Sequence, residues 1–232
     1  MSKYVGVKTL EVLEGAENYN KWIASRLKPF LKSPTLEIGA GTGNISEYMT
    51  GFKELVLTDI DSQLVNSLAK KFKKNKNIKV EMFNAASNLS KIKSKFKSIY
   101  GVNVLEHIEN DQKALKNLHG LLESSGKLVL LVPAKRIAYN ELDRSLGHYR
   151  RYEKDELREK LMNAGFRVDE LEFFNIVGLL SWIVRNYISK NHGKLEKSQV
   201  KSFNWVVPVL KAIEPKKGLP FGISLIAVAS KK

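Results

Sequence analysis

The sequence of 232 residues contains no cysteine, which excludes disulfide bonds, thiolate metal sites and a cysteine nucleophile together. It also lacks a long apolar run: the longest covers residues 176–184, whereas a membrane-spanning helix needs roughly 20 residues. The first residues include no apolar stretch of the kind found in signal peptides. We therefore expect a cytoplasmic protein, with peripheral contact to a membrane left open.

Acidic residues are few beside the basic ones, since 24 Asp and Glu face 39 Lys and Arg, which gives a net charge of +15. An excess of this size favours an anionic partner such as nucleic acid, a membrane surface or an acidic substrate. A lysine-rich, solvated surface produces the same excess. Ten lysines lie between Lys70 and Lys97, where Glu81 is the only acid. That stretch lacks the arginines and exposed aromatics of nucleic-acid sites, so a nucleic acid is not the favoured partner.

Short apolar runs alternate with segments of helical periodicity along the chain. The runs at 35–38, 54–58, 78–83, 98–104, 127–132, 166–174 and 223–229 predict strands, and the segments 19–31, 63–74, 111–122 and 153–164 predict helices. This alternation is typical of an α/β fold, a mostly parallel sheet with helices on both faces.

The length and the lack of low-complexity linkers favour one domain over residues 1–232. Within it we expect an N-terminal helix at 17–32, a cofactor-binding core at 33–132, a substrate-side segment at 133–165 and a helical insertion at 175–221 before the last strand. That insertion contains an apolar set large enough to form a lid, a membrane contact or a dimer contact.

Three glycines, Gly39, Gly41 and Gly43, follow the first predicted strand, and we expect a helix directly after them. Small residues at such a turn allow a ligand to approach the main chain closely, and a helix N-terminus offers free N–H groups. The spacing differs from the G-x-G-x-x-G pattern of dinucleotide-binding proteins, and the Lys-Ser/Thr pair of a phosphate loop is missing. Asp59 ends the next strand, where a carboxylate can accept both hydroxyls of a ribose.

Four segments together resemble the class I S-adenosylmethionine-dependent methyltransferases over about residues 33–170. They are Glu37 with the glycine loop, the strand end at 57–61, the Asn-Val-Leu-Glu-His-Ile segment at 103–108 and the turn at 122–128. The Gly-His-Tyr-Arg-Arg-Tyr run at 147–152 resembles a subgroup linked with saccharide or lipid modification. The resemblance implies a Rossmann-like sheet of seven strands, six parallel and one antiparallel, with S-adenosylmethionine bound across the carboxyl ends of the strands.

Carried over by position, the resemblance implies a set of cofactor-binding residues. Asp59 would bind the ribose hydroxyls, Ile60 would pack on the adenine, and Asn84 would accept from the adenine amino group where many members have Asp. The other members of the set are Glu37, Gly39, Ala40, Gly41, Gly43 and Asn103. The main chain of Asn103 would meet the methionine ammonium.

The catalytic candidates follow the fourth and fifth strands. We predict His107 or His148 as the general base, because an imidazole titrates near neutral pH, and Glu106 as their neighbour in the site. The predicted substrate-binding residues are Tyr149, Arg150 and Arg151, whose guanidinium groups suit a phosphate or carboxylate.

A metal site is the alternative for the same segment. Small-RNA-end 2′-O-methyltransferases and quinone-pathway O-methyltransferases have a similar Glu-x-x-Glu-His segment that binds a divalent ion. Here Asn103 replaces the first Glu, while Glu106 and His107 persist and His148 is a further candidate ligand. Because the loss of a charged ligand weakens the binding of a hard cation, we expect no metal.

The sequence thus predicts an enzyme that methylates a small-molecule, saccharide or lipid-linked acceptor. An RNA or protein methyltransferase that uses the lysine-rich face is the alternative, and a cofactor-binding regulator without catalysis is the alternative of another class. The identity of the acceptor and the oligomeric state stay open.

Overall fold

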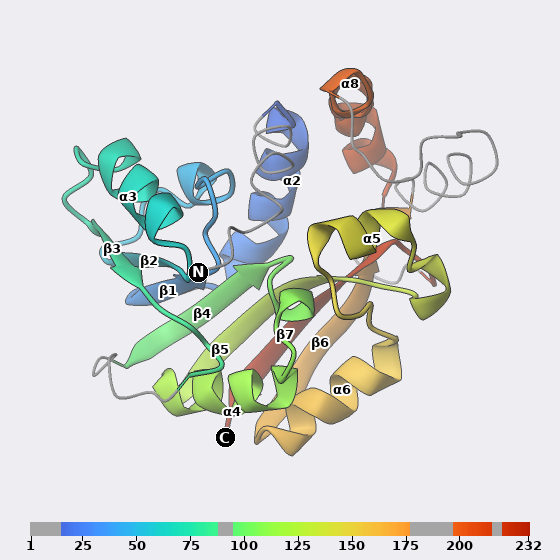
Figure 1. Ribbon diagram of the computed structural model, residues 1–232. Coiled ribbons are helices and arrows are strands. Elements are labelled where there is room, and N and C mark those ends of the chain that lie inside the picture. Colours follow the sequence, from blue (N-terminus) through green and yellow to red (C-terminus); the bar gives the residue numbers. More distant parts are fainter. Residues whose placement is uncertain (1–14, 88–94, 177–196, 215–219) are drawn as a thin grey trace.

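The computed structural model describes residues 15–87, 95–176, 197–214 and 220–232. Its centre is a seven-stranded sheet with the order β3-β2-β1-β4-β5-β7-β6 (Figure 1). The strands are β1 Thr35–Ile38, β2 Leu55–Asp59, β3 Ile78–Met82, β4 Phe96–Val102, β5 Leu122–Pro133, β6 Phe166–Phe174 and β7 Ser224–Lys231. β7 runs antiparallel to both of its neighbours, and the other six strands share one direction. This confirms the predicted fold class.

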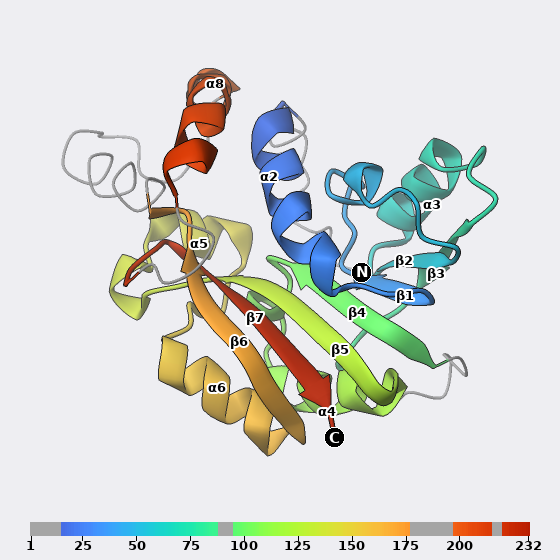
Figure 2. The ribbon, with the colours of Figure 1, turned by 180° about the vertical axis from the view of Figure 1, so that it is seen from behind.

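Helices cover both faces of the sheet, as Figure 2 shows from behind. The helices are α2 Glu17–Leu27, α3 Ser62–Lys71, α4 Asp111–Leu121, α5 Glu141–Leu146, α6 Lys154–Asn163 and α8 Lys197–Ile213. One apolar core joins α4 and α6 to the sheet, and the other joins α2, α3 and α8 to its opposite face. In β5, Leu128 and Leu130 belong to the first core and Val129 and Leu131 to the second, as the two-residue period of a strand requires.

Local sequence explains where several helices begin and end. Asp61 precedes α3, and its carboxylate accepts from the main-chain N–H groups of Gln63 and Leu64, which satisfies two donors that the first turn leaves free. Gly165 follows α6 with a φ of +97°, a conformation that glycine adopts without the steric cost of a side chain. These signals place the helices that support the sheet.

The helix expected directly after the glycine loop is not there, so that prediction was wrong. Residues Ser46–Tyr48 form a single 3₁₀ turn instead. Gly43 and Gly51 both have positive φ angles, of 80° and 92°, and only the seven residues 44–50 separate them. A segment this short, bounded by two residues in left-handed conformation, leaves no room for several helical turns.

None of the helices in the described part of the chain has both the length and the apolar composition needed to cross a bilayer. Of the expected insertion at 175–221, α8 is described, whereas residues 177–196 and 215–219 lie outside the described ranges. The division into segments and the role of the insertion stay predictions.

Substitution of Gly43 by Ala tests how tightly the loop packs on α3. A Cβ at Gly43 would lie 2.9 Å from Phe72 Cε2 and 3.0 Å from Leu68 Cδ2, whereas the structure describes no atom within 4 Å of a Cβ at Gly51. Gly51→Ala therefore serves as the control that carries only the left-handed backbone cost of about 1–2 kcal/mol. We expect Gly43→Ala to lose a further 1–3 kcal/mol or so through overpacking, measured as the free energy of urea unfolding. Equal losses would contradict the packing argument.

Candidate functional site

A cavity of about 340 Å³ lies at the carboxyl ends of β1, β2 and β4, where open α/β sheets place their ligands. Its volume is within the range of small-molecule sites. Eight of the nine residues predicted to bind a cofactor line it, namely Glu37, Gly39, Ala40, Gly41, Asp59, Ile60, Asn84 and Asn103. His107, Ile108 and Glu109 line the same space. Residues from four separate stretches of sequence therefore share one cavity.

Gly43 is the predicted cofactor residue that does not appear in the cavity lining formed by the described residues. Its α-carbon faces Leu68 and Phe72 of the segment around α3. Close packing against these two side chains thus explains why a glycine stands at this position. Its predicted contact with a cofactor stays a prediction.

The glycine loop is fastened to the end of β2 by hydrogen bonds. The N–H of Ala40 donates to the carbonyl of Thr58 at 2.8 Å, and the N–H of Gly41 donates to Asp59 Oδ2 at 2.9 Å. Asp59 Oδ1 accepts from the N–H of Asp61. Since a carboxylate has about four acceptor positions, Asp59 keeps capacity for hydroxyl groups of a ligand.

Glu37 is buried beneath the loop. Its Oε2 accepts hydrogen bonds from the hydroxyls of Ser46 at 2.6 Å and Tyr100 at 2.5 Å. Burial raises the pKa of Glu37 from 4.5 to about 7, and the two hydroxyl donors only partly oppose that rise. Tyr100 is the direct cross-strand neighbour of Glu37 in the β1–β4 register. The carboxyl group therefore links the loop to the middle of the sheet.

Ile60 and Asn84 also line the cavity. The side chain of Ile60 is 64% exposed although it is apolar, which suits contact with a flat ligand. Asn84 Oδ1 accepts from the N–H of Ala86 at 2.8 Å, so its amide also orders the turn after β3. Asn103 follows β4 with a φ of +50°, and its N–H donates to the carbonyl of Leu131.

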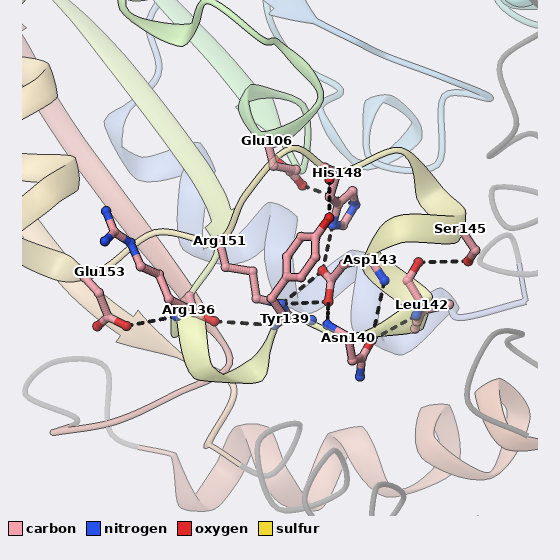
Figure 3. Close-up of polar contacts among 11 residues, drawn as sticks. Glu106, Arg136, Tyr139, Asn140, Leu142, Asp143, Ser145, His148, Arg151 and Glu153 are labelled. Atoms are coloured by element: carbon pink, nitrogen blue, oxygen red, sulfur yellow. Dashed lines mark hydrogen bonds and ion pairs between the residues drawn. The ribbon is translucent and has the colours of Figure 1, made fainter. Parts of the chain in front are cut away.

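The three predicted catalytic residues lie together, as Figure 3 shows for Glu106 and His148. His148 Nε2 is 4.0 Å from Glu106 Oε1. The rings of His107 and His148 meet edge to face, with centroids 4.6 Å apart. Burial, followed by the neighbouring His148, lowers the pKa of His107 to about 4, and burial raises the pKa of Glu106 to about 8. Of the three residues, His107 lines the cavity.

Asp143, which sequence reasoning missed, holds this cluster in place (Figure 3). His148 Nδ1 is 2.8 Å from Asp143 Oδ1, and the Nε atom of Arg151 donates to both carboxylate oxygens at 3.0 Å. Burial raises the pKa of Asp143, but the hydrogen bond from His148 and the charge of Arg151 outweigh burial and hold that pKa below its ordinary value. Its carboxylate also accepts from the N–H of Asn140, which closes a capping box on α5. A capping box was the one signal in the sequence that pointed to Asp143.

The guanidinium groups predicted to bind substrate are engaged within the protein. Arg151 is buried against Asp143. Arg150 Nη1 lies 2.9 Å from Asp111 Oδ2, and its Nη2 donates to the carbonyl of Glu109. Tyr149 is half-exposed beside Arg150. The contact of these three residues with a substrate stays a prediction.

Comparison with known proteins places this geometry in a family. Residues 15–171 match the family described as "Methyltransferase domain". No curated protein sequence matches the chain significantly. Among solved structures, an S-adenosylmethionine-dependent methyltransferase from Thermotoga maritima is 14% identical, with a TM-score of 0.66 and 98% of each chain covered.

Two further structures are alike in fold. The partner of a methyltransferase activator from Haloferax volcanii is 12% identical, with a TM-score of 0.70 and coverage of 99% of this chain and 98% of that one. An S-adenosylmethionine-dependent methyltransferase from Clostridium acetobutylicum is also 12% identical, with a TM-score of 0.60 and coverage of 92% and 91%. At these identities the likeness concerns the fold alone.

Glu37→Gln tests the buried carboxyl group beneath the loop. Between pH 4.5 and about 7 the unfolded chain loses the Glu37 proton while the folded protein keeps it, so this group makes the protein less stable as pH rises. Glutamine cannot ionise but still accepts from both hydroxyls. We expect the variant to gain stability over the wild type across this window, by on the order of 3 kcal/mol, with no further change above it. Urea unfolding from pH 4 to 9 measures the difference; a difference that does not vary with pH would contradict the expectation.

Asp143→Ala tests the buried ion pair. The substitution leaves the Arg151 guanidinium buried without its carboxylate, and breaking such a pair costs about 3–5 kcal/mol. Glu141→Ala in the same helix is the control, because Glu141 pairs with Arg144 at the exposed surface and such pairs contribute about 0–1 kcal/mol. Unfolding free energies of the two variants, measured side by side, should differ clearly; similar losses would show that Asp143 is not holding a buried charge.

Proposed function

The chain belongs to the methyltransferase-domain family and is an enzyme that uses S-adenosylmethionine, and from that premise we propose that it methylates a small-molecule, saccharide or lipid-linked acceptor. The observation that carries the proposal is the shared cavity, which is lined by the glycine loop, by Asp59 and by His107. A methyl donor and its acceptor must meet in one space from which water is excluded. The likeness of residues 147–152 to a subgroup linked with saccharide or lipid modification supports the acceptor class.

The residues present fit the cofactor. Asp59 offers free acceptor positions for ribose hydroxyls, and the exposed, apolar Ile60 offers a surface for the adenine. Gly39 has a φ of +62°, and a Cβ there would lie 2.4 Å from Val104 Cγ2. Only glycine therefore fits at this position of the cavity lining. Among the described residues, the buried Thr42 Oγ1 has no hydrogen-bond partner, and it adds a polar group at the cavity wall.

When bound, S-adenosylmethionine supplies an electrophilic methyl group on a sulfonium. The glycine loop and Asp59 hold the donor in a fixed orientation at the sheet edge. An acceptor with a hydroxyl or amine must lose a proton as the new bond forms, and we assign that proton to the cluster of Glu106, His107 and His148. His107 brings the cluster to the cavity surface, and Asp143 orients His148 behind it.

The acceptor side lies toward the segment 147–152. We propose that Tyr149 contacts the acceptor through its half-exposed ring. In this proposal Arg150 and Arg151 do not contact the acceptor. Their ion pairs with Asp111 and Asp143 hold the segment 147–152 against the cluster. Their role is then to position Tyr149 and His148.

The lysine-rich face gives less support to an RNA acceptor. Lys71 lies 2.8 Å from Glu47, and Lys79 lies 2.8 Å from Glu54, so two of its cations pair with acids of the protein itself. Most of the described lysines of this face lie on the segment around α3 and β3, while Lys95 and Lys97 lie at the start of β4. Charge along an edge strand such as β3 also prevents unwanted strand pairing.

Asp59→Asn tests the cofactor site. The loss of charge-assisted hydrogen bonds, worth about 1.5–3 kcal/mol each, should weaken S-adenosylmethionine binding about 10- to 100-fold. Asp61→Asn is the matched control, because Asp61 caps α3 and Asn caps equally well. Isothermal titration calorimetry with the wild type and both variants measures the affinities. No binding by the wild type, or equal binding by Asp59→Asn, would overturn the site.

The acceptor is found by transfer of labelled methyl groups to glycan, lipid and RNA extracts. Labelling of the glycan or lipid fraction that disappears in Asp59→Asn supports the proposed acceptor class. Labelling of RNA alone would establish the alternative, and cofactor binding without any labelling would favour a regulator.

A further inference from the structure

Glu106 is fully buried, and neither oxygen of its carboxyl group has a hydrogen-bond partner among the described residues. The residue lies in the 3₁₀ turn Leu105–His107 that follows β4. Its main-chain carbonyl accepts from the N–H of Tyr149, so the turn itself is held firmly. A buried carboxyl group without hydrogen bonds is unfavourable, and the side chain therefore calls for a bound proton or a bound cation.

Two imidazoles surround this carboxyl group. His148 Nε2 lies 4.0 Å from Glu106 Oε1, beyond hydrogen-bond distance. One ligand atom from each of Glu106, His107 and His148 can be chosen so that all three lie within 4.8 Å of one another. Ligand atoms around one tetrahedral ion at about 2.0–2.2 Å lie about 3.3–3.6 Å apart, so the three atoms would have to move together by about 1 Å to share an ion.

The outer side of each imidazole is already occupied. His148 Nδ1 hydrogen-bonds Asp143 Oδ1 at 2.8 Å, and this contact leaves the Nε2 lone pair directed toward Glu106 (Figure 3). The ring of His107 hydrogen-bonds the main chain of Gly147. Metal-binding histidines characteristically donate their second ring nitrogen to a carboxylate or a carbonyl, which fixes the ring and its tautomer. Both histidines have this arrangement.

We propose that Glu106, His107 and His148 form a binding site for a divalent transition-metal ion of the zinc class. Two imidazoles and one carboxylate are a known ligand set of catalytic zinc, with a further position left open. They suit magnesium poorly, because magnesium takes oxygen ligands. The site departs from our expectation that no metal binds. That expectation rested on Asn103 in place of an acid and did not include the hydrogen bond by which Asp143 orients His148.

The open coordination position suggests how the ion would take part in methyl transfer, and this part of the inference rests on the proposed function. Since His107 lines the cavity, an ion beside it faces the place where an acceptor would lie. A bound hydroxyl is more acidic on such an ion. With the ion in place the two imidazoles would be ligands, so an acceptor hydroxyl would give up its proton to solvent before its oxygen takes the methyl group. The favoured acceptors are therefore hydroxyl groups.

The experiment measures metal binding directly, without activity. Tag-free protein stripped with a chelator is titrated with Co²⁺, followed by visible absorption, and with Zn²⁺, followed by calorimetry. We expect one ion per chain, visible bands of low coordination number, and a rise in melting temperature with Zn²⁺. Wild-type protein that takes up no stoichiometric ion would overturn the proposal.

Two variants locate the ion. Glu106→Gln and His148→Gln remove one ligand each and should weaken Zn²⁺ binding at least 100-fold. His119→Gln is the matched control, because His119 packs edge-on against Phe166 in another part of the fold and should bind as the wild type does. Circular dichroism of the metal-free proteins shows whether each variant folds. Binding unchanged in a folded Glu106→Gln protein would overturn the site.

A titration of the same stripped protein with S-adenosylmethionine separates the two proposals. Cofactor binding without zinc binding would reject the metal site and leave methyl transfer standing. Zinc binding without cofactor binding would reject the proposed function and leave the metal site standing.

Discussion

The common direction of six strands is the constraint on which this molecule depends. Because β1, β2 and β4 are parallel and in register, their carboxyl ends meet at one edge of the sheet. Glu37, Asp59 and Asn103 reach the same cavity for that reason alone. The same register places Tyr100 beside Glu37, so the hydrogen bonds that support the glycine loop originate in the core of the sheet. The support of the glycine loop and the packing of the sheet thus share side chains.

The second constraint is the buried contact of Arg151 with Asp143. It ties the segment 147–152 to α5. Asp143 also binds His148, which lies beside the turn after β4 that carries Glu106 and His107. Buried ion pairs contribute little net stability compared with apolar residues. Here the pair positions a side chain: Asp143 orients the imidazole of His148 toward Glu106 and His107, which lie about 40 residues earlier in the chain. The cluster of Glu106, His107 and His148 is therefore ordered by side-chain polar contacts, while the glycine loop is ordered by backbone geometry.

No lysine or arginine is among the described residues that line the cavity. Lysines of the stretch from Lys70 to Lys97 that the structure describes are exposed, on the segment around α3 and β3 and at the start of β4. The ionisable side chains at the site are instead a few buried acids, two histidines and two arginines that are paired with acids. Burial explains the difference, because each charge at the site needs a partner and the surface lysines are solvated.

Periodicity and the glycine loop were enough to predict the parallel sheet and the place of its ligand edge. Period-two and period-3.6 patterns are local properties of the chain, and Asp59 follows its strand directly. Other features were decided only in three dimensions. The helix expected after Gly43 became a 3₁₀ turn between two left-handed glycines. Arg151 resembled a surface clamp in the sequence, yet its buried carboxylate partner lies in another element. The Glu106 carboxyl group is buried without a hydrogen-bond partner among the described residues. Such burial has no local signature in a sequence, because it arises only when separate segments have packed into a core.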